Sequence, residues 1–137
     1  MSDPSPHERR TPADLAAGVP YAYAAVTRGR PLLVFTAGAC PLDASGSTVA
    51  PGDVATQAEA VMANLRSALA AAGARLDDVV KTTVYVASSD RSDLFAAWQV
   101  VHRHFGTHEP PSTLLGVSVL GYPDQLVEVE AIAAVSS

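Results

Sequence analysis

The stretch that decides the fold is PPSTLLGVSVLGYPDQLVEVEAIA, residues 110–133. Its composition predicts two strands joined by a turn, over about residues 113–120 and 126–135. In the second strand, apolar residues at the odd positions alternate with Glu128 and Glu130. Because successive side chains of a strand point to opposite faces, one face is apolar and the other presents two carboxylates. An ordinary solvated sheet face would show the same pattern, so the pattern alone leaves both interpretations open.

The composition is that of one globular domain. The chain has 137 residues, of which 48% are apolar and 17% are charged, and this length suits a single core. The net charge is −5 and the basic residues are scattered. Nucleic acid is therefore not an expected partner, because phosphate contacts need clustered Lys and Arg. No apolar run approaches the roughly 20 residues that cross a bilayer, so no membrane partner is expected.

The N-terminal residues 1–14 are polar and rich in proline. We expect a flexible tail there, followed by a single domain over residues 15–137. The tail lacks the apolar segment of a signal peptide. Cys40 is the only cysteine, and a lone thiol cannot form an internal disulfide. Together these features predict a cytoplasmic protein.

The first predicted helix has two candidate N-terminal caps. Asp53 precedes the helical pattern directly, whereas Thr56 and Glu59 have the spacing of a capping box. Gly73 is expected to end the helix after about residue 72. The apolar stripe of this helix consists of Val61, Leu65, Ala68, Leu69 and Ala72.

Three further strands and a second helix complete the predicted order. The strands are expected over about residues 21–26, 32–36 and 79–87. The second helix ends at Gly106, and its apolar stripe consists of Leu94, Trp98, Val101 and Phe105. Two amphipathic helices can cover one face of a mixed sheet. The other face, with its two glutamates, is then available to a partner subunit, so we expect a homo-oligomer with its pocket between subunits.

Five segments, in this order and at this spacing, resemble the RidA/YjgF (Rid) family. They are Pro20-Tyr21, the run Phe35-Thr36-Ala37-Gly38 followed by Pro41 and Asp43, Asn64-Leu65, Val79 to Val86, and Val127 to Ala133. The resemblance implies an α+β, chorismate-mutase-like fold with a single mixed sheet and two helices packed on one face. It also implies a homotrimer whose sheets form a central barrel, with clefts between subunits. The activity it implies is hydrolysis of reactive enamines and imines, such as 2-aminoacrylate, to 2-keto acids and ammonia, without a metal or organic cofactor.

The working residues of the family fall on four positions of this sequence. The pocket tyrosine falls on Tyr21, and the glycine whose backbone holds the substrate falls on Gly38. The helix asparagine falls near Gln99, within one helical turn. The carboxylate that positions or activates water falls on Glu128. Imine hydrolysis needs a proton donor and a base for water, and a glutamate can serve as both, with Tyr21 beside it as the second catalytic residue.

The sequence departs from the family where an arginine pairs with the substrate carboxylate. Ser112 stands at that position, Thr113 follows it, and Leu114 replaces a cysteine or valine. Arg103, on the second helix, could substitute for that arginine only through a different geometry. A charge-assisted bond to a carboxylate contributes about 1.5–3 kcal/mol. Its loss predicts weak activity on 2-imino acids and favours a small-molecule substrate without a carboxylate.

Other residues are candidates for the pocket wall. Ala39 and Cys40 adjoin the pocket glycine, and Tyr122 lies in a turn with one residue more than the family pattern. Cys40 is either a nucleophile or, as we favour, a small buried apolar residue. Trp98 is expected in the core rather than at a substrate.

Three functions are compatible with these residues. The first is a hydrolase-type or proton-transfer enzyme that acts on an enamine, imine or related intermediate without a carboxylate, with Glu128 as the general acid and base. The second is a residual deaminase of 2-aminoacrylate and 2-imino acids. The third is a non-catalytic trimer that binds a metabolite or a protein. An endoribonuclease, a name also given to family members, is not supported by the acidic net charge.

Overall fold

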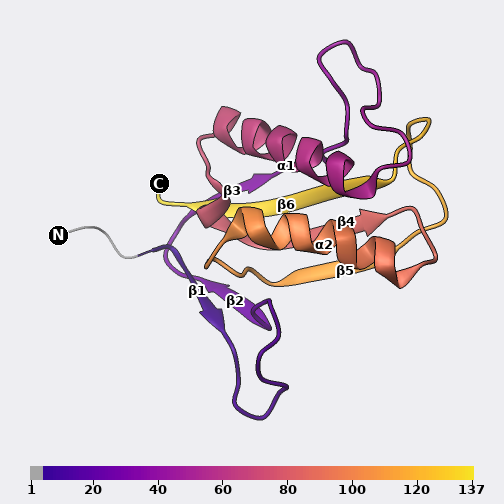
Figure 1. Ribbon diagram of the computed structural model, residues 1–137. Helices are drawn as coiled ribbons and strands as arrows, with labels where there is room; N and C mark the ends of the chain where they lie inside the picture. The colour runs from indigo at the N-terminus through magenta and orange to yellow at the C-terminus, as the bar shows by residue number, and fades with distance from the viewer. Residues whose placement is uncertain (1–4) are drawn as a thin grey trace.

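The structure is a computed structural model that describes residues 5–137. Its centre is a four-stranded mixed sheet with the order β3-β6-β4-β5 (Figure 1). The strands are β3 (Leu32–Phe35), β4 (Val79–Val86), β5 (Ser112–Gly116) and β6 (Val127–Val135). β6 is antiparallel to both β3 and β4, whereas β4 and β5 are parallel. A parallel pair needs a crossover connection, and helix α2 (Arg91–Phe105) supplies it.

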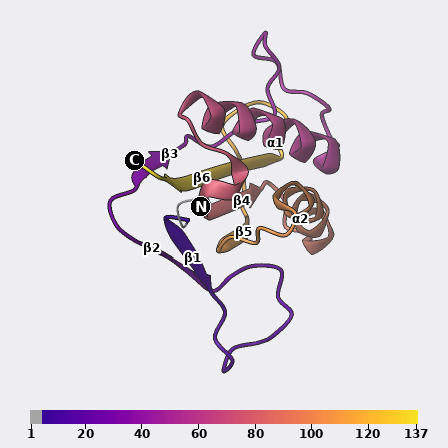
Figure 2. The ribbon, with the colours of Figure 1, turned by 90° about the vertical axis from the view of Figure 1, so that its left-hand side faces the viewer.

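Both helices lie on the same face of this sheet, as the end-on view shows (Figure 2). Helix α1 (Val54–Ala71) packs over β6, and α2 packs over β4 and β5. The fully buried side chains of this layer include Met62, Leu65, Leu69, Val84, Val101, Val127 and Val129. The predicted α+β fold, with two helices on one face of a mixed sheet, is therefore confirmed.

Strand β6 alternates as its sequence predicts. The residues that face the helices are buried: Val127, Val129, Ala131 and Ala133. Glu128 and Glu130 point to the opposite, open face and are partly exposed. This open face also carries exposed apolar side chains, with Phe35 69%, Leu33 51% and Leu115 43% exposed.

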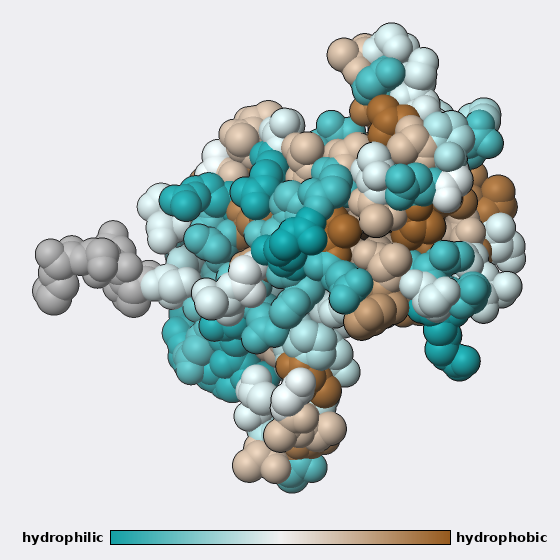
Figure 3. Space-filling view, in the orientation of Figure 1, coloured by the Kyte–Doolittle hydropathy of each residue, from teal (hydrophilic) through white to brown (hydrophobic). Residues whose placement is uncertain are grey.

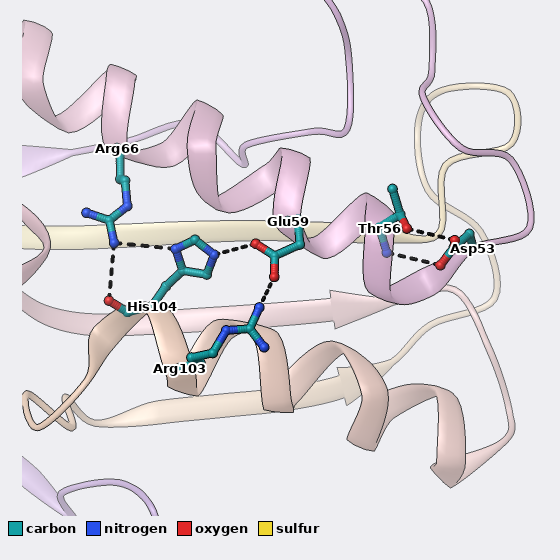
Figure 4. A network of polar contacts seen from close by, with 6 residues as sticks. All are labelled: Asp53, Thr56, Glu59, Arg66, Arg103 and His104. Atoms are coloured by element: carbon teal, nitrogen blue, oxygen red, sulfur yellow. Dashed lines mark hydrogen bonds and ion pairs between the residues drawn. The ribbon is translucent and has the colours of Figure 1, made fainter.

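Helix α1 begins at the first of its two candidate caps. The Asp53 carboxylate accepts from the Thr56 backbone N–H at 3.0 Å and from the Thr56 hydroxyl at 2.7 Å (Figure 4). Thr56 therefore lies inside the helix, and the alternative capping box is not formed. Gly73 has a φ of +81° just beyond the helix end, where glycine is favoured. Of the predicted stripe, Ala68 and Ala72 are exposed, and the buried positions include Gln57, Ala58 and Met62 instead.

Gln57 is a fully buried polar residue that fastens two loops to α1. Its amide nitrogen donates to the Asp124 carbonyl at 2.9 Å and to the Ala50 carbonyl at 3.3 Å. Its amide oxygen accepts from the Leu126 backbone N–H at 2.8 Å. Both polar ends of the side chain are thus satisfied, as a buried amide requires. The contact holds the turn before β6 in place.

A charged network joins the outer surfaces of α1 and α2 (Figure 4). Glu59 pairs with Arg103 and accepts from His104 Nε2 at 2.7 Å. Arg66 lies 3.4 Å from His104 Nδ1, which must then act as the acceptor. Burial, together with the charges of Arg66 and Arg103, lowers the pKa of His104. Figure 3 shows hydrophilic residues gathered over this crossing of the two helices.

The N-terminal segment contains a strand that the sequence did not suggest. The expected flexible tail covers residues 1–14, of which residues 1–4 lie outside the described part of the chain. Strand β1 (His7–Arg10) pairs antiparallel with β2 (Ala24–Thr27) in a separate ribbon. Arg9 and His7 also bond to the body of the domain, at the Thr107 and Asp77 carbonyls. A short 3-10 turn, η1 (Leu76–Asp78), precedes β4.

Two further differences concern the expected elements. The strand expected over residues 113–120 ends at Gly116, where a Cβ atom would lie 2.7 Å from the Ser88 carbonyl oxygen. Trp98 is only partly buried, although Val101 and Phe105 of the same stripe are in the core. Neither helix of residues 5–137 combines the length and hydrophobicity needed to cross a membrane.

Candidate functional site

The Glu128 carboxylate is held at the edge of the open sheet face by two donors. Ala39 forms a bridge with Val129, which places Cys40 next to Glu128 across the two strands. The Cys40 thiol donates to Glu128 Oε1 at 3.2 Å. The Gln125 amide donates to the same oxygen at 3.1 Å. Glu128 is therefore a positioned carboxylate, not a freely solvated strand residue.

Gly38 makes room for this carboxylate. A Cβ atom at this position would lie 2.2 Å from Glu128 Oε2 and 2.7 Å from Glu128 Cγ. Real Cβ atoms do not approach other heavy atoms this closely, so any other residue would displace the Glu128 side chain. The Glu128 carboxylate can therefore lie directly against the backbone of Gly38 because this residue has no side chain.

Cys40 is a hydrogen-bond donor in this cluster. Burial, the bond to Glu128 and the charge of that carboxylate raise the pKa of Cys40 to about 11. The thiol is therefore protonated at neutral pH, which opposes a role as a nucleophile, because the thiolate is the reactive form. It is half-buried, and its polar contact distinguishes it from the purely apolar residue that we expected. The Asn64 side chain donates to the Cys40 carbonyl at 2.8 Å and holds this segment against α1.

Gln125 is a site residue that the sequence did not reveal. It is 4% exposed, and its amide nitrogen donates to the Val127 carbonyl at 3.1 Å as well as to Glu128. Its amide oxygen accepts from the Tyr122 backbone N–H at 3.1 Å. Gln125 therefore connects the turn that has one extra residue to the carboxylate. The Tyr122 side chain itself is 48% exposed.

A second group of candidate residues lines a pocket beside β5. Its volume is about 410 Å³, and its wall consists of Pro20, Tyr21, Trp98, Ser112, Thr113 and Leu114. The Ser112 hydroxyl donates to the Pro110 carbonyl at 2.9 Å. None of the lining residues is basic. The wall is aromatic and apolar apart from its hydroxyl groups.

Two candidate residues of α2, Gln99 and Arg103, do not line this pocket. Gln99 is exposed on α2 and does not line it; its neighbour Trp98 does. Arg103 points to α1, where it pairs with Glu59 (Figure 4). Arg103 therefore does not line the pocket beside Ser112.

Ser112 and Leu114 of the second group lie on the sheet face opposite Glu128, whereas Thr113 points to the same open face as Glu128 and accepts from Lys81 there. Ser112 is paired in register with Thr82, which is fully buried toward the helices, and Leu114 packs against the core. Glu128 points to the open face. Because the sheet lies between them, one copy of the chain cannot present Glu128 and Ser112 to one small molecule.

A smaller polar cluster occupies the open face beside Glu128. The Tyr85 hydroxyl donates to Glu130 at 2.7 Å, and this bond raises the pKa of Tyr85. The Lys81 amine donates to the Thr113 hydroxyl at 2.7 Å, and burial lowers the pKa of Lys81. Lys81 therefore lies on the face opposite Ser112.

The chain is similar to a group of named proteins. It matches the family described as Endoribonuclease L-PSP over residues 11–135. A RutC family protein of Pyrococcus abyssi is 38% identical over 100 residues, which cover 73% of this chain and 76% of the relative. The 2-iminobutanoate/2-iminopropanoate deaminase of Escherichia coli K12 is 31% identical over 102 residues, or 74% of this chain and 78% of the relative.

Two solved structures are also similar to this chain. The protein YyfB of the conserved Rid protein family from Yersinia pestis superposes with a TM-score of 0.86 at 28% identity, covering 95% of this chain and 99% of that one. Escherichia coli TdcF with bound serine gives a TM-score of 0.66 at 31% identity, covering 88% of this chain and 91% of that one.

Proposed function

Because the chain belongs to the RidA/YjgF (Rid) family, we propose that it is a small-molecule enzyme of the hydrolase type. Its substrate is an enamine, an imine or a related intermediate that lacks a carboxylate, and Glu128 is its general acid and base. The observation that carries the proposal is the Glu128 carboxylate, which Cys40 and Gln125 fix against Gly38. A carboxylate held in one position suits proton transfer.

The chemistry needs one group that moves protons in both directions. Glu128 takes a proton from water as the oxygen adds to the carbon of the C=N bond, and it passes this proton to the imine nitrogen, which forms a carbinolamine. Glu128 then moves the hydroxyl proton of the carbinolamine to the same nitrogen, so that the C–N bond breaks, ammonia leaves and a carbonyl compound remains. Tyr21, a neutral donor in the second group, would orient the substrate nitrogen or oxygen. No cofactor takes part in these steps.

We further propose that the working enzyme is a homotrimer, whose clefts combine Glu128 of one subunit with the pocket beside Ser112 of the next. The opposite orientation of these two side chains supports this assembly. The exposed apolar residues of the open face also support it, because a face of that kind is commonly covered in an oligomer.

Deamination of 2-imino acids is the second candidate. The name of the Escherichia coli relative favours it. The pocket beside Ser112 argues against it, because its wall contains no basic residue to receive a carboxylate. A desolvated carboxylate without a cation is costly.

The test measures hydrolysis of two kinds of imine. An amino-acid oxidase generates 2-imino acids, with semicarbazide as the competing trap, and benzophenone imine serves as a neutral substrate. We expect acceleration of the neutral imine that Glu128→Gln abolishes, while Glu130→Gln on the same strand and face retains it. Equal acceleration of 2-imino acids would support the second candidate. Full activity of Glu128→Gln would remove Glu128 from the mechanism.

A complementation experiment tests the shared cleft. Glu128→Gln and Ser112→Trp each disable one half of the site, so each variant alone should be inactive. When the two are refolded together, some clefts receive an intact Glu128 from one subunit and an intact Ser112 from its neighbour. We expect part of the native activity to return. If no activity returns from mixed trimers, the two halves do not belong to one site.

A further inference from the structure

The hydroxyl of Ser112 has a fixed hydrogen-bonding role in its pocket. A serine hydroxyl has one hydrogen to donate and two lone pairs to accept with. In this structure Ser112 Oγ lies 2.9 Å from the Pro110 carbonyl oxygen, which can only accept. The hydrogen of Ser112 is therefore used within the chain. What remains for a ligand is an acceptor.

Rotation of this hydroxyl toward a ligand would be unfavourable. Pro110 is buried, and its carbonyl would lose the partner that the Ser112 hydroxyl provides. A buried polar group without a partner is costlier than the net gain from one ordinary hydrogen bond. Ser112 thus presents lone pairs to any group placed against it.

The surrounding wall restricts the rest of the ligand. Trp98, Tyr21, Leu114 and Pro20 supply most of the 410 Å³ pocket. The Trp98 ring already stacks with His102, at a centroid distance of 6.0 Å and an interplanar angle of 18°, which holds the indole in place. A fixed aromatic wall favours a flat apolar group.

We propose that this pocket selects ligands that place an N–H or O–H donor on Ser112, next to a flat apolar group. The substrate is then an enamine or imine that carries an N–H or O–H donor beside an aromatic or similar ring. A carboxylate is rejected because its lone pairs would face those of Ser112. A ketone or ester oxygen at this position is disfavoured for the same reason. The inference rests on the proposed function in taking this pocket as half of the substrate site.

Three ring compounds of nearly equal shape test the proposal. Benzamide carries an N–H donor, methyl benzoate is neutral and only accepts, and benzoate is an anion. Trp98 is the only tryptophan of the chain, so its fluorescence reports binding to the native oligomer directly. We expect benzamide to bind about tenfold more tightly than methyl benzoate, the ratio that one net hydrogen bond provides. Benzoate should bind least.

Two variants at position 112 and one control make the test specific. Ser112→Ala should reduce the benzamide preference to about one while methyl benzoate binds as before. Ser112→Arg should reverse the order and bind benzoate about tenfold more tightly than the native protein does. Ser67→Ala, which removes an exposed hydroxyl on α1, should change nothing.

Several results would overturn the proposal. One is that benzoate or methyl benzoate binds the native protein as tightly as benzamide does. Another is that the preference for benzamide persists in Ser112→Ala. A third is that millimolar benzamide does not change the fluorescence of Trp98. These are equilibrium measurements and need no turnover. A benzamide preference without any imine hydrolysis would therefore reject the proposed reaction alone, whereas hydrolysis without the preference would reject this inference alone.

Discussion

Replacing Gly38 by alanine should displace the Glu128 carboxylate with little damage to the fold. The new Cβ atom would lie 2.2 Å from Glu128 Oε2 and 2.7 Å from Glu128 Cγ, so the side chain must move by about 1 Å or more to reach an ordinary contact distance. That movement breaks the bond from Cys40, at 3.2 Å. The carboxylate is partly exposed and can be rehydrated, so we expect the free energy of unfolding to fall by about 1 kcal/mol, the contribution of one hydrogen bond.

The Cys40 thiol reports this displacement, because it is the only cysteine of the chain. Its pKa is raised to about 11 by burial first, and then by the bond to Glu128 and its charge. Once the carboxylate moves away, the second and third causes weaken while burial remains, so the pKa falls but stays above its ordinary value. Each unit of that fall increases the thiolate fraction about tenfold at a fixed pH below both values. Alkylation by iodoacetamide at mildly alkaline pH should accelerate accordingly.

The matched control is Gly121→Ala, since nothing lies within 4 Å of a Cβ atom built at Gly121. It should leave both the alkylation rate and the thermal midpoint as they are. Glu128→Gln should lower the thiol pKa as Gly38→Ala does, because it also removes the negative charge. If Gly38→Ala alkylates at the native rate while Glu128→Gln alkylates faster, the alanine has not displaced the carboxylate and the fitted contact is refuted.

Two further predictions concern stability. Gln57→Ala removes three buried hydrogen bonds and leaves a cavity, so we expect a loss of about 2–4 kcal/mol in urea unfolding, against little change for the exposed Gln99→Ala. The folded state lowers the pKa of His104 below its ordinary value of 6.5, so it binds that proton less readily than the unfolded chain does. The stability that His104 contributes is present above that value and is lost as the pH falls through it toward the folded pKa. In the His104→Asn variant, the thermal midpoint should therefore fall less between about pH 7 and about pH 5 than it does in the native protein. A fall as steep as the native one would contradict this assignment. His102→Asn, on the same helix, is the control variant.

Much of the fold could be predicted because it depends on local periodicity. The alternation around Glu128 fixed both the strand and the face of its carboxylate, since a period of two permits no other arrangement once the apolar residues are buried. The helix end at Gly73 followed from similarly local chemistry, whereas the sequence left two candidate caps open and the structure selects Asp53. Strand β1 could not be anticipated in this way. Its residues, His7 to Arg10, are polar and charged, and their extended conformation comes from pairing with β2.

The residues of the candidate site were suggested by the resemblance to the family and not by local periodicity. Gly38 is one of them, and the structure shows that its missing Cβ leaves room for the Glu128 carboxylate. Gln125 leaves no mark in the sequence, since a polar residue before a strand is ordinary and only the fold shows that its amide is buried. That Trp98 lines the pocket beside Ser112 while the exposed Gln99 does not is likewise visible only in the fold. A shift of one residue turns a helix by about 100°, so an alignment uncertain within one turn cannot say which side chain lines the pocket.

The resemblance to the family predicts that Ser112 stands in place of an arginine, and the contacts of this serine lead to one physical argument. A pocket could lose its cation and still receive an anion if another basic group moved in, but Arg103 is paired with Glu59 and Lys81 lies across the sheet. Ser112 also has a hydrogen-bonding preference of its own at this position. The Ser112 hydroxyl donates to the Pro110 carbonyl, so its lone pairs are what it can offer to a ligand. On the proposed role of this pocket, a substrate suited to it carries an N–H or O–H donor of its own.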